Sequence, residues 1–284
     1  TSNLFMTLTD LNNNIVKRNN FVKNYIYFFH GAISTTRIYT STAFDSYDTI
    51  LCNGDYQVKE IRQREKLVNL KEKKLIKSGY FYFDYLQRKI NYKIIPDEIL
   101  IAPSWNYNQK NFINENLELI IKEILQKGYK VRFRPHPENF VRSKNKIEYI
   151  CNKFKNELFT LDSSKENKES MEKAKCLITD NSGIAIEYIL LFKKPVLYFD
   201  DVDKIHNKEF DKYKNLQTMD NIVKDKFGFS FTINEIESLD LIIEKSISEF
   251  INKDNEIKVF TNKNFYNFNQ TIKKFEDLTH KYFD

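Results

Sequence analysis

Short apolar runs rich in β-branched and aromatic residues alternate with longer amphipathic stretches along the chain. This alternation is typical of parallel sheets whose strands are joined by helices. The apolar runs predict strands at residues 3–9, 25–29, 49–51, 99–102, 130–134, 176–179 and 195–199. The amphipathic stretches predict helices at residues 55–64, 113–127, 184–192, 239–252 and 267–282. The polar, Asn/Lys-rich region 204–231 has no clear period and carries no predicted element.

The rhythm of strand and helix restarts after Pro96, which predicts two α/β halves. We expect one Rossmann-like domain at residues 1–95 and a second at residues 96–284, the latter ending in two helices. The first half is short for a complete domain of this type, and the chain begins with Thr-Ser instead of Met. We therefore expect that an N-terminal piece is missing.

The composition of the 284-residue chain is 41% hydrophobic and 30% charged, which supports a folded core and excludes global disorder. No apolar stretch approaches the roughly eighteen residues that a membrane span needs. Cys52, Cys151 and Cys176 are far apart and match no metal-binding spacing. This cysteine usage suits a reducing cytosol, where we expect the thiols to fill space in the core.

The formal net charge of +6 is concentrated in residues 59–77, where eight Lys/Arg against three Glu give +5. The plainer interpretation is a solvated helix face, and the alternative is a surface that binds anionic lipid. No nucleic-acid-binding motif accompanies the segment, so we expect no nucleic acid partner. We expect a cytoplasmic protein, with peripheral association at the inner face of the cell membrane as a separate hypothesis.

Four predicted strands end in polar residues, and ligands of open parallel sheets bind at those ends. The first place is His30-Gly31, after an aromatic strand. His30 could act as a general base near neutral pH, and Gly31 would let a ligand come close. The alternative is a histidine packed inside a turn. The second place is Ser104-Trp105, where the hydroxyl could contact a phosphate or cap the next turn.

The third place is Arg134-Pro135-His136-Pro137. The two prolines restrict the backbone of His136, and Pro137 favours an extended conformation for the residue before it. Arg134 and His136 side by side are suited to clamp a diphosphate.

The fourth place is Asp180-Asn181-Ser182-Gly183, which runs into an apolar helix that contains Glu187. Free N–H groups at a helix start form an anion site, helped here by the Ser182 hydroxyl and by the close approach that Gly183 allows. A carboxylate on an apolar helix is costly unless it faces a cleft or a partner, and nucleotide ribose hydroxyls would satisfy it. The alternative is an ordinary cap by Asp180 or Ser182, with Glu187 paired to a lysine.

The order of these motifs resembles the CDP-glycerol glycerophosphotransferase family, the teichoic-acid and capsule polymer transferases with a GT-B fold. The motifs that carry the likeness are His30-Gly31, Ala102–Trp105, Arg134–Pro137, Thr179–Gly183 and Lys194-Pro195. The likeness extends over Tyr27–Phe199, and Gly79-Tyr80 through Asp84 is similar to the family's Gly-Tyr-Pro-Arg-x-Asp segment.

The resemblance implies an α/β enzyme with two Rossmann-type domains that face a central cleft. Residues 1–95 would bind the acceptor and residues 96–284 the nucleotide donor. Such an enzyme moves a polyol phosphate, glycerol phosphate or a similar group, from a CDP-activated donor to a hydroxyl of a lipid-linked or glycan acceptor. The product would be a polymer of a bacterial cell envelope.

By position, the resemblance gives catalytic roles to His30 and His136, with His30 as the base. Donor binding would fall to Ser104, Arg134, Asn181, Ser182, Gly183 and Glu187. Gly31, Pro135, Pro137 and Asp180 would shape the site. The chain departs from the family at Asn181, Gly183 and Glu187, where the last is usually aspartate, and at Phe81-Tyr82, where the family has Pro-Arg. These departures leave the transferred group open.

We expect metal-independent electrostatic catalysis without a cofactor, because no Asp/Glu/His cluster in the sequence resembles a metal site. Two alternatives stay open. One is a GT-B glycosyltransferase that uses a CMP- or UDP-sugar in surface polysaccharide synthesis. The other is a binding module of the same fold without catalysis.

Overall fold

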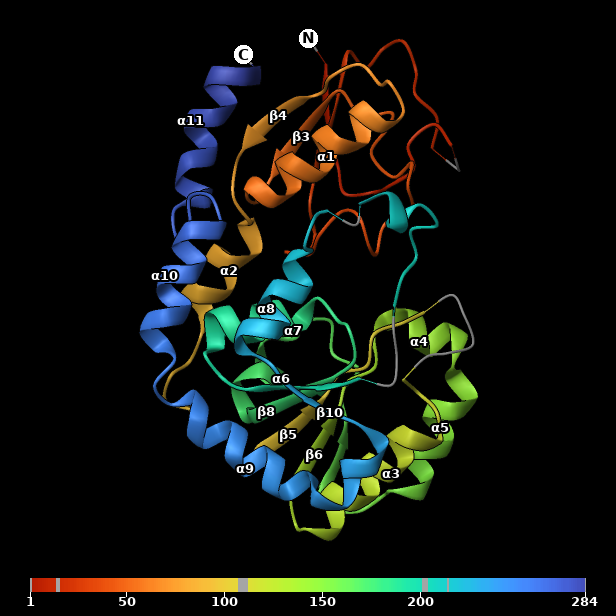
Figure 1. The fold of residues 1–284 in the computed structure, drawn as a ribbon, viewed down its shortest axis with the longest axis vertical. Helices are drawn as coiled ribbons and strands as arrows, with labels where there is room; N and C mark the ends of the chain where they lie inside the picture. The colour runs from red at the N-terminus through yellow and green to blue at the C-terminus, as the bar shows by residue number, and fades with distance from the viewer. Residues whose placement is uncertain (1, 14–15, 107–111, 201–203, 214, 284) are drawn as a thin grey trace. The chain divides into compact units, whose positions relative to one another are not determined.

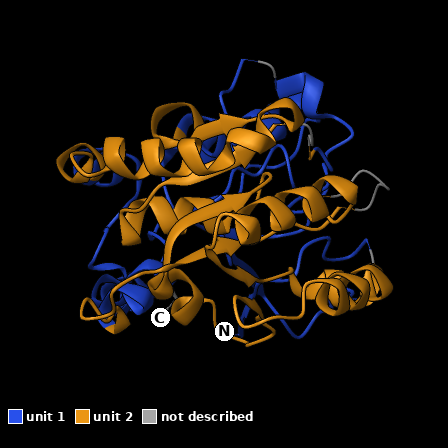
Figure 2. Ribbon diagram, turned by 90° about the horizontal axis from the view of Figure 1, so that it is seen from below, with its two compact units in different colours: residues 1–88, 205–222, 258–284 blue, residues 89–204, 223–257 orange. Residues whose placement is uncertain are grey.

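The computed structural model describes residues 2–13, 16–106, 112–200, 204–213 and 215–283. The chain divides into two compact units (Figure 2). Unit 1 contains residues 1–88, 205–222 and 258–284, and unit 2 contains residues 89–204 and 223–257. The chain first passes from unit 1 to unit 2 between Arg88 and Lys89, whereas we expected the boundary between residues 95 and 96. Residues 205–222 and 258–284, which we expected in the second domain, belong to unit 1 instead.

Unit 1 is built on a four-stranded parallel sheet in the order β1-β2-β3-β4. Figure 1 labels β3 and β4 of this sheet, beside α1. Its strands are β1 (Asn3–Met6), β2 (Asn24–Phe28), β3 (Thr49–Cys52) and β4 (Lys74–Lys77). Its helices are α1 (Asp55–Leu67), α2 (Phe81–Lys89), the 3₁₀ turn Phe210–Tyr213 and α11 (Thr271–Phe283).

Both faces of the central strands β2 and β3 are buried, as is typical of parallel sheets. Tyr25, Tyr27 and Ile50 pack on one face with Ile61 of α1. Alternate positions of the same strands point to the other face, where α11 covers them. This packing explains why the C-terminal helix belongs to unit 1.

Unit 2 is built on a six-stranded parallel sheet in the order β10-β9-β8-β5-β6-β7. Its strands are β5 (Glu98–Ile101), β6 (Lys130–Phe133), β7 (Phe159–Leu161), β8 (Ala174–Thr179), β9 (Val196–Phe199) and β10 (Phe229–Phe231). The chain builds outward from β5 through β6 to β7 and then returns to place β8 on the other side of β5. The β5–β8 pair is therefore the topological switch point, where doubly wound sheets bind ligands.

The helices of unit 2 are α3 (Glu115–Gln126), α4 (Pro137–Arg142), α5 (Lys144–Lys153), α6 (Lys168–Lys173), α7 (Ile184–Glu187) and α9 (Leu239–Phe250). A π-helix (Tyr188–Phe192) continues α7, and a 3₁₀ helix (Ile233–Ser238) precedes α9. Helices α8 (Met219–Phe227) and α10 (Asp254–Asn264) carry the chain from one unit to the other. None of the described helices is long and apolar enough to cross a membrane.

Helix α3 illustrates how the sequence specifies an element of this sheet. Leu117, Ile120, Ile121 and Ile124 recur at helical spacing and are buried. The Asn114 side chain caps the helix start by accepting from two backbone N–H groups.

The predicted strands and helices are present, with ends that differ by a few residues. Residues 184–192 are helical as predicted, although the second half is a π-helix. Region 204–231, which carried no prediction, contains a 3₁₀ turn, α8 and β10. Cys52 and Cys176 are buried free thiols as expected, whereas Cys151 is only half-buried.

Candidate functional site

His30 lies just past the carboxyl end of β2, and its side chain is exposed. The protein around it lowers the pKa of the imidazole from its ordinary value, because partial desolvation disfavours the charged form. The ring meets Tyr39 edge-on, with 6.2 Å between the ring centroids. An accessible imidazole that stays neutral at neutral pH can accept a proton.

Gly31 offers space next to His30. A Cβ built on Gly31 would make its nearest contact at 3.7 Å, with a side-chain carbon of Ile33. This is an ordinary contact distance, so the described residues leave room for a Cβ here. This space is consistent with the expectation that a ligand can come close to the backbone at Gly31.

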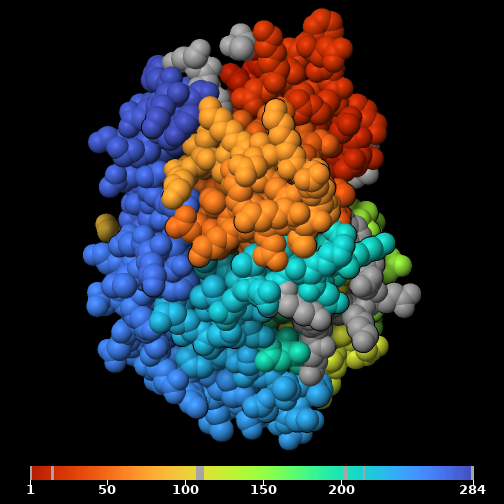
Figure 3. Space-filling model, turned by 45° about the horizontal axis from the view of Figure 1, so that its top comes forward, coloured from red at the N-terminus to blue at the C-terminus, as the bar shows by residue number. Residues whose placement is uncertain are grey.

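The basic segment 59–77 is not one helix, because it runs through α1, a connection and β4. Arg64 pairs with Asp45 at 2.8 Å and with Glu209 at 2.5 Å. Lys77 pairs with Asp55 at 3.4 Å, and Lys73 is buried. Part of the segment reaches the surface (orange in Figure 3), but several of its charges stabilise unit 1.

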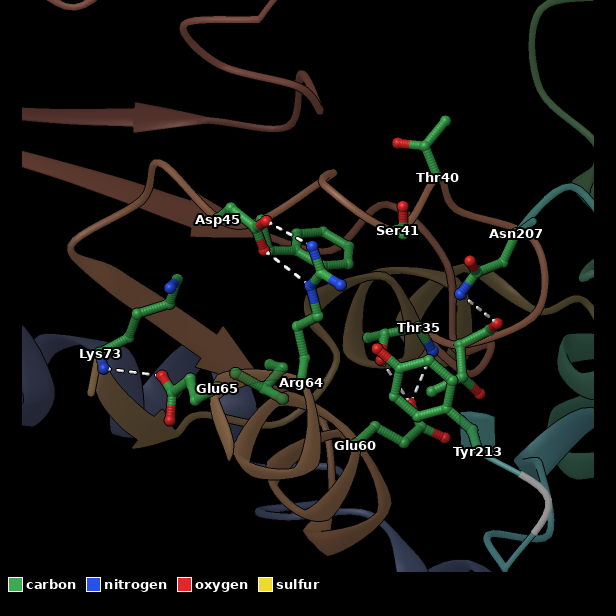
Figure 4. A pocket seen from close by; sticks show the side chains of 13 residues that line it. Thr35, Thr40, Ser41, Asp45, Glu60, Arg64, Glu65, Lys73, Asn207 and Tyr213 are labelled. Carbon is green, nitrogen blue, oxygen red and sulfur yellow. Dashed lines mark hydrogen bonds and ion pairs between the residues drawn. The ribbon is translucent and has the colours of Figure 1, made fainter. Parts of the chain in front are cut away.

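A small polar cavity lies between α1, the loop 35–45 and residues 207–213 (Figure 4). One carboxylate oxygen of Glu60 accepts from the Thr35 backbone N–H at 2.6 Å and from its hydroxyl at 2.7 Å. The other oxygen of Glu60 is buried and has no hydrogen-bond partner among the described residues, and burial raises the pKa of Glu60 to about 7. The cavity offers about 20 Å³, enough for roughly one water molecule. It is too small for a nucleotide.

Ser104 and Asp180 join at the switch point of unit 2. The Ser104 backbone N–H donates to Asp180 Oδ1 at 2.8 Å, and the Ser104 hydroxyl donates to Oδ2 at 2.6 Å. Asn139 donates to the Ser104 carbonyl at 3.1 Å. The structure thus differs from two interpretations of the sequence. Ser104 is buried and ties two strand ends together instead of offering its hydroxyl as a donor to a ligand, and Asp180 does not cap the following helix.

His136 caps the N-terminus of α4, and its φ of −58° and ψ of 144° give the extended conformation predicted from Pro137. Its Nδ1 accepts from the Glu138 backbone N–H at 3.2 Å. The neutral imidazole must therefore carry its proton on Nε2. The Trp105 ring lies beside it, with 6.1 Å between centroids. Pro135 is buried before this turn, and Pro137 opens the helix, where a missing N–H has no cost.

Arg134 is held by partners that the sequence did not reveal. It pairs with Asp162 at 3.0 Å and donates to the Ser164 hydroxyl at 2.9 Å and to the Ser164 carbonyl at 3.0 Å. Burial opposes ionisation of Asp162, but hydrogen bonds from Ser164 and Ser170 and the charge of Arg134 lower its pKa to about 2. Asp162 directly follows β7. Its position at a strand end is the one feature of the sequence that could have identified it as a site residue.

Residues 181–183 lie half-buried before α7, with Gly183 in the cap position. Among the described residues no side chain caps this helix through a hydrogen bond, so the Ser182 hydroxyl does not serve as an ordinary cap. Glu187 is buried, and the amide of Asn167 donates to it at 3.3 Å. The structure thus brings the Ser104, His136 and 181–187 segments to the carboxyl ends of three neighbouring strands.

Lys194 has a structural role at the opposite ends of the strands. Its ammonium donates to the carbonyls of Met171, Glu172 and Ala174 at 3.0, 2.8 and 2.7 Å. Desolvation lowers the pKa of Lys194 to about 8. The Lys194-Pro195 motif therefore anchors the start of β9.

In the part of the chain that the structure describes, no three His, Cys, Asp or Glu side chains lie together in a way that could hold a metal ion.

Solved structures that are similar to this chain include the following three. Two structures of the wall teichoic acid polymerase TagF match 99% of this chain with TM-scores of 0.57. They are 16% and 19% identical to it, with 72% and 71% of their own chains covered, and the second was soaked with CDPG. The S. aureus MnaA–UDP structure matches 93% of this chain and 70% of its own at 12% identity, with a TM-score of 0.53. These likenesses and the two parallel sheets confirm the expected GT-B-like fold.

A search of curated protein sequences found no match. A family model described as CDP-glycerol:poly(glycerophosphate) glycerophosphotransferase matches residues 21–266, most of the chain. The protein is thus an enzyme of the glycerophosphotransferase type, as the motif order predicted. The chain belongs to the CDP-glycerol:poly(glycerophosphate) glycerophosphotransferase family.

Proposed function

We propose that this enzyme transfers glycerol phosphate from CDP-glycerol to a hydroxyl at the end of a growing cell-envelope polymer, with His30 as the general base. The observation that carries the proposal is the exposed His30 imidazole at the end of β2, whose pKa is lowered so that it is neutral near pH 7. Membership of the family supplies the reaction class. The soak of TagF with CDPG supports the same donor for this chain.

The proposed step makes and breaks one bond at phosphorus. The acceptor oxygen attacks the phosphorus that bears the glycerol, and its proton goes to the free ring nitrogen of His30. The bond between that phosphorus and the oxygen shared with CMP breaks, and CMP leaves with the electron pair. The products are an acceptor that is longer by one glycerol phosphate, and CMP.

Unit 2 supplies the proposed donor-binding groups. The Nε2–H of His136 donates to a diphosphate oxygen, since Nδ1 is already used in capping α4. The backbone of Asn181, Ser182 and Gly183 receives the phosphate, and Glu187 accepts from a ribose hydroxyl. Arg134 acts mainly through its charge, because its guanidinium donates to Ser164 and pairs with Asp162. This electrostatic set would work without a metal cofactor.

A donor panel tests the reaction. The protein is incubated with a glycerol phosphate lipid analogue and, separately, with CDP-glycerol, CDP-ribitol, a CMP-sugar and a UDP-sugar, and products are followed by phosphorus NMR. We expect CMP and a new phosphodiester signal from CDP-glycerol only. Turnover of a sugar nucleotide alone would make the protein a glycosyltransferase, and binding of CDP-glycerol without turnover would make it a binding module.

We also propose that the exposed lysines of segment 59–77 hold the enzyme at an anionic membrane surface, where a lipid-linked acceptor would reside. Lys59, Lys66 and Lys71 are exposed. Each lysine near an anionic surface contributes about 1 kcal/mol. Co-sedimentation with phosphatidylglycerol vesicles at low salt should be lost in the Lys59→Gln/Lys66→Gln/Lys71→Gln variant. Absence of sedimentation by the unmodified protein would remove the idea.

A further inference from the structure

Four consecutive backbone carbonyls after β2 each accept a hydrogen bond from a side chain. The first of them is the carbonyl of His30 itself. The pairs are Tyr80 hydroxyl to His30 at 3.0 Å, Asn53 amide to Gly31 at 3.0 Å, Tyr56 hydroxyl to Ala32 at 2.7 Å, and Gln57 amide to Ile33 at 3.1 Å. The loop has no helix or strand ladder to pair these carbonyls, so the four side-chain bonds help to fix its path.

The four donors lie in the segments that follow the neighbouring strands of the same sheet. Asn53 directly follows β3, Tyr56 and Gln57 lie in the first turn of α1, and Tyr80 follows β4. Because β2 pairs with β3 and β3 with β4, the donors approach the loop from the sheet that carries His30. Gln57 also accepts from the Asn53 backbone N–H at 2.7 Å, which joins two of the donors to each other.

The support continues beyond Ile33. Glu60, one helical turn after Tyr56 and Gln57, binds Thr35 through one carboxylate oxygen. Asp220 accepts from the Ser34 backbone N–H at 3.0 Å, and the Asn207 amide donates to the Thr36 carbonyl at 2.7 Å. Figure 4 shows Glu60, Thr35 and Asn207 around the cavity beneath this loop. The loop is thus held from His30 to Thr36.

We propose that Asn53, Tyr56, Gln57 and Tyr80 are positioning residues that hold the His30 imidazole in its working place. This inference rests on the proposed role of His30 as the base. A general base must lie within hydrogen-bonding reach of the proton it takes, and a displacement of about 1 Å can cost about 100-fold in rate. Asn53, Tyr56 and Gln57 belong to none of the motifs that carry the family resemblance. Tyr80 belongs to the Gly79-Tyr80 segment, and the proposal gives it a role.

Tyrosine-to-phenylalanine substitutions test the proposal, since they remove one donor and keep the ring. The test variant is Tyr56→Phe/Tyr80→Phe. The matched controls are Tyr47→Phe, whose hydroxyl donates to the Leu8 carbonyl in unit 1, and Tyr188→Phe, whose hydroxyl donates to the Ala174 carbonyl at 2.9 Å in unit 2. For each protein we would measure Tm, kcat, KM for CDP-glycerol and the pH titration of the His30 ring by proton–carbon NMR. The chain has four histidines, so His30→Asn identifies the signal.

We expect kcat of the test variant to fall about 10- to 100-fold while KM stays within about two-fold, and the His30 signal and its pKa to shift. The controls should lower Tm by a similar amount and leave kcat and the His30 signal unchanged. An unaltered His30 signal in the test variant, or an equal fall of kcat in the controls, would overturn the proposal. A shifted His30 signal together with full turnover by His30→Asn would uphold positioning and reject His30 as the base.

Discussion

The two histidines of the candidate site differ in what their ring nitrogens do. His136 uses Nδ1 to cap α4, so its Nε2 can only donate while the ring is neutral. His30 is exposed and has a lowered pKa, which leaves a nitrogen lone pair available near neutral pH. One histidine is therefore suited to hold a diphosphate oxygen, and the other to accept a proton. The same residue type serves two roles because the surroundings differ.

The pH dependence of the rate should report the His30 pKa. A base works only when deprotonated, so kcat/KM should be low in acid and rise with pH. Because desolvation lowers the pKa of His30 below 6.5, the rise should be centred below pH 6.5 and level off above it. The measurement is kcat/KM for CDP-glycerol from pH 5 to 8. A profile centred above 6.5 would contradict a desolvated neutral base.

Two substitutions separate the capping and binding roles of His136. Asparagine is a good N-cap residue, so His136→Asn should keep the thermal stability but lose the Nε2–H donor. His136→Ala loses both and should cost about 1 kcal/mol of stability. We expect the affinity for CDP-glycerol, measured by calorimetry, to fall about 10-fold or more in both variants. Full affinity in a folded His136→Asn protein would remove His136 from the donor site.

At the level of elements, the sequence predicted the strands better than what lies at their ends. A buried strand can be recognised from an apolar run such as Leu100–Ile101, because the signal lies in consecutive residues of the sequence. The bond between Ser104 and Asp180 joins residues 76 positions apart, and nothing local announces it. The extended backbone of His136 was predicted from Pro137, but the helix α4 that begins at Pro137 was not, although proline also opens helices. The 184–192 stretch, apolar except for Glu187, carried no sequence signal for its π-helical half.

The turns after β3 and β4 carry glycines for a reason that the sequence did not show. A Cβ on Gly54 would lie 2.0 Å from the Asn264 carbonyl oxygen. A Cβ on Gly79, whose φ is +92°, would lie 2.2 Å from the carbonyl oxygen of Tyr266. The backbone before α11 thus packs directly on these strand ends. Asp84 adds a further link by accepting from the Ile272 backbone N–H at 3.1 Å.

Replacement of Gly79 therefore has a clear expected cost. Gly79→Ala combines a positive φ with a backbone collision and should destabilise the protein by about 3 kcal/mol or more. Gly128→Ala is the matched control, since its φ is +81° but a Cβ there would meet no atom of the described residues within 4 Å. The control should cost about 1–2 kcal/mol. Urea unfolding measures both, and equal costs would contradict the close packing at Gly79.

At the level of the whole molecule, charge is used inside the fold as well as at its surface. Arg64 and Arg134 each bind carboxylates within their own unit. The excess of positive charge can be read from the sequence, but its division between surface lysines and paired arginines cannot. Catalysis by fixed dipoles and side-chain cations is proposed to operate without a metal ion. Turnover of CDP-glycerol should therefore be unchanged after dialysis against EDTA, and a loss restored by Mg²⁺ would reject metal independence.

The most direct test of the central claim is the rate at which CMP forms from CDP-glycerol in the presence of a glycerol phosphate acceptor. The comparison is between the unmodified protein, His30→Asn and the control His280→Asn on the exposed surface of α11. We predict that His30→Asn slows CMP formation by about 100- to 10,000-fold, the range of a lost general base, while the control keeps the full rate. A His30→Asn protein that forms CMP as fast as the unmodified enzyme would contradict histidine-assisted transfer.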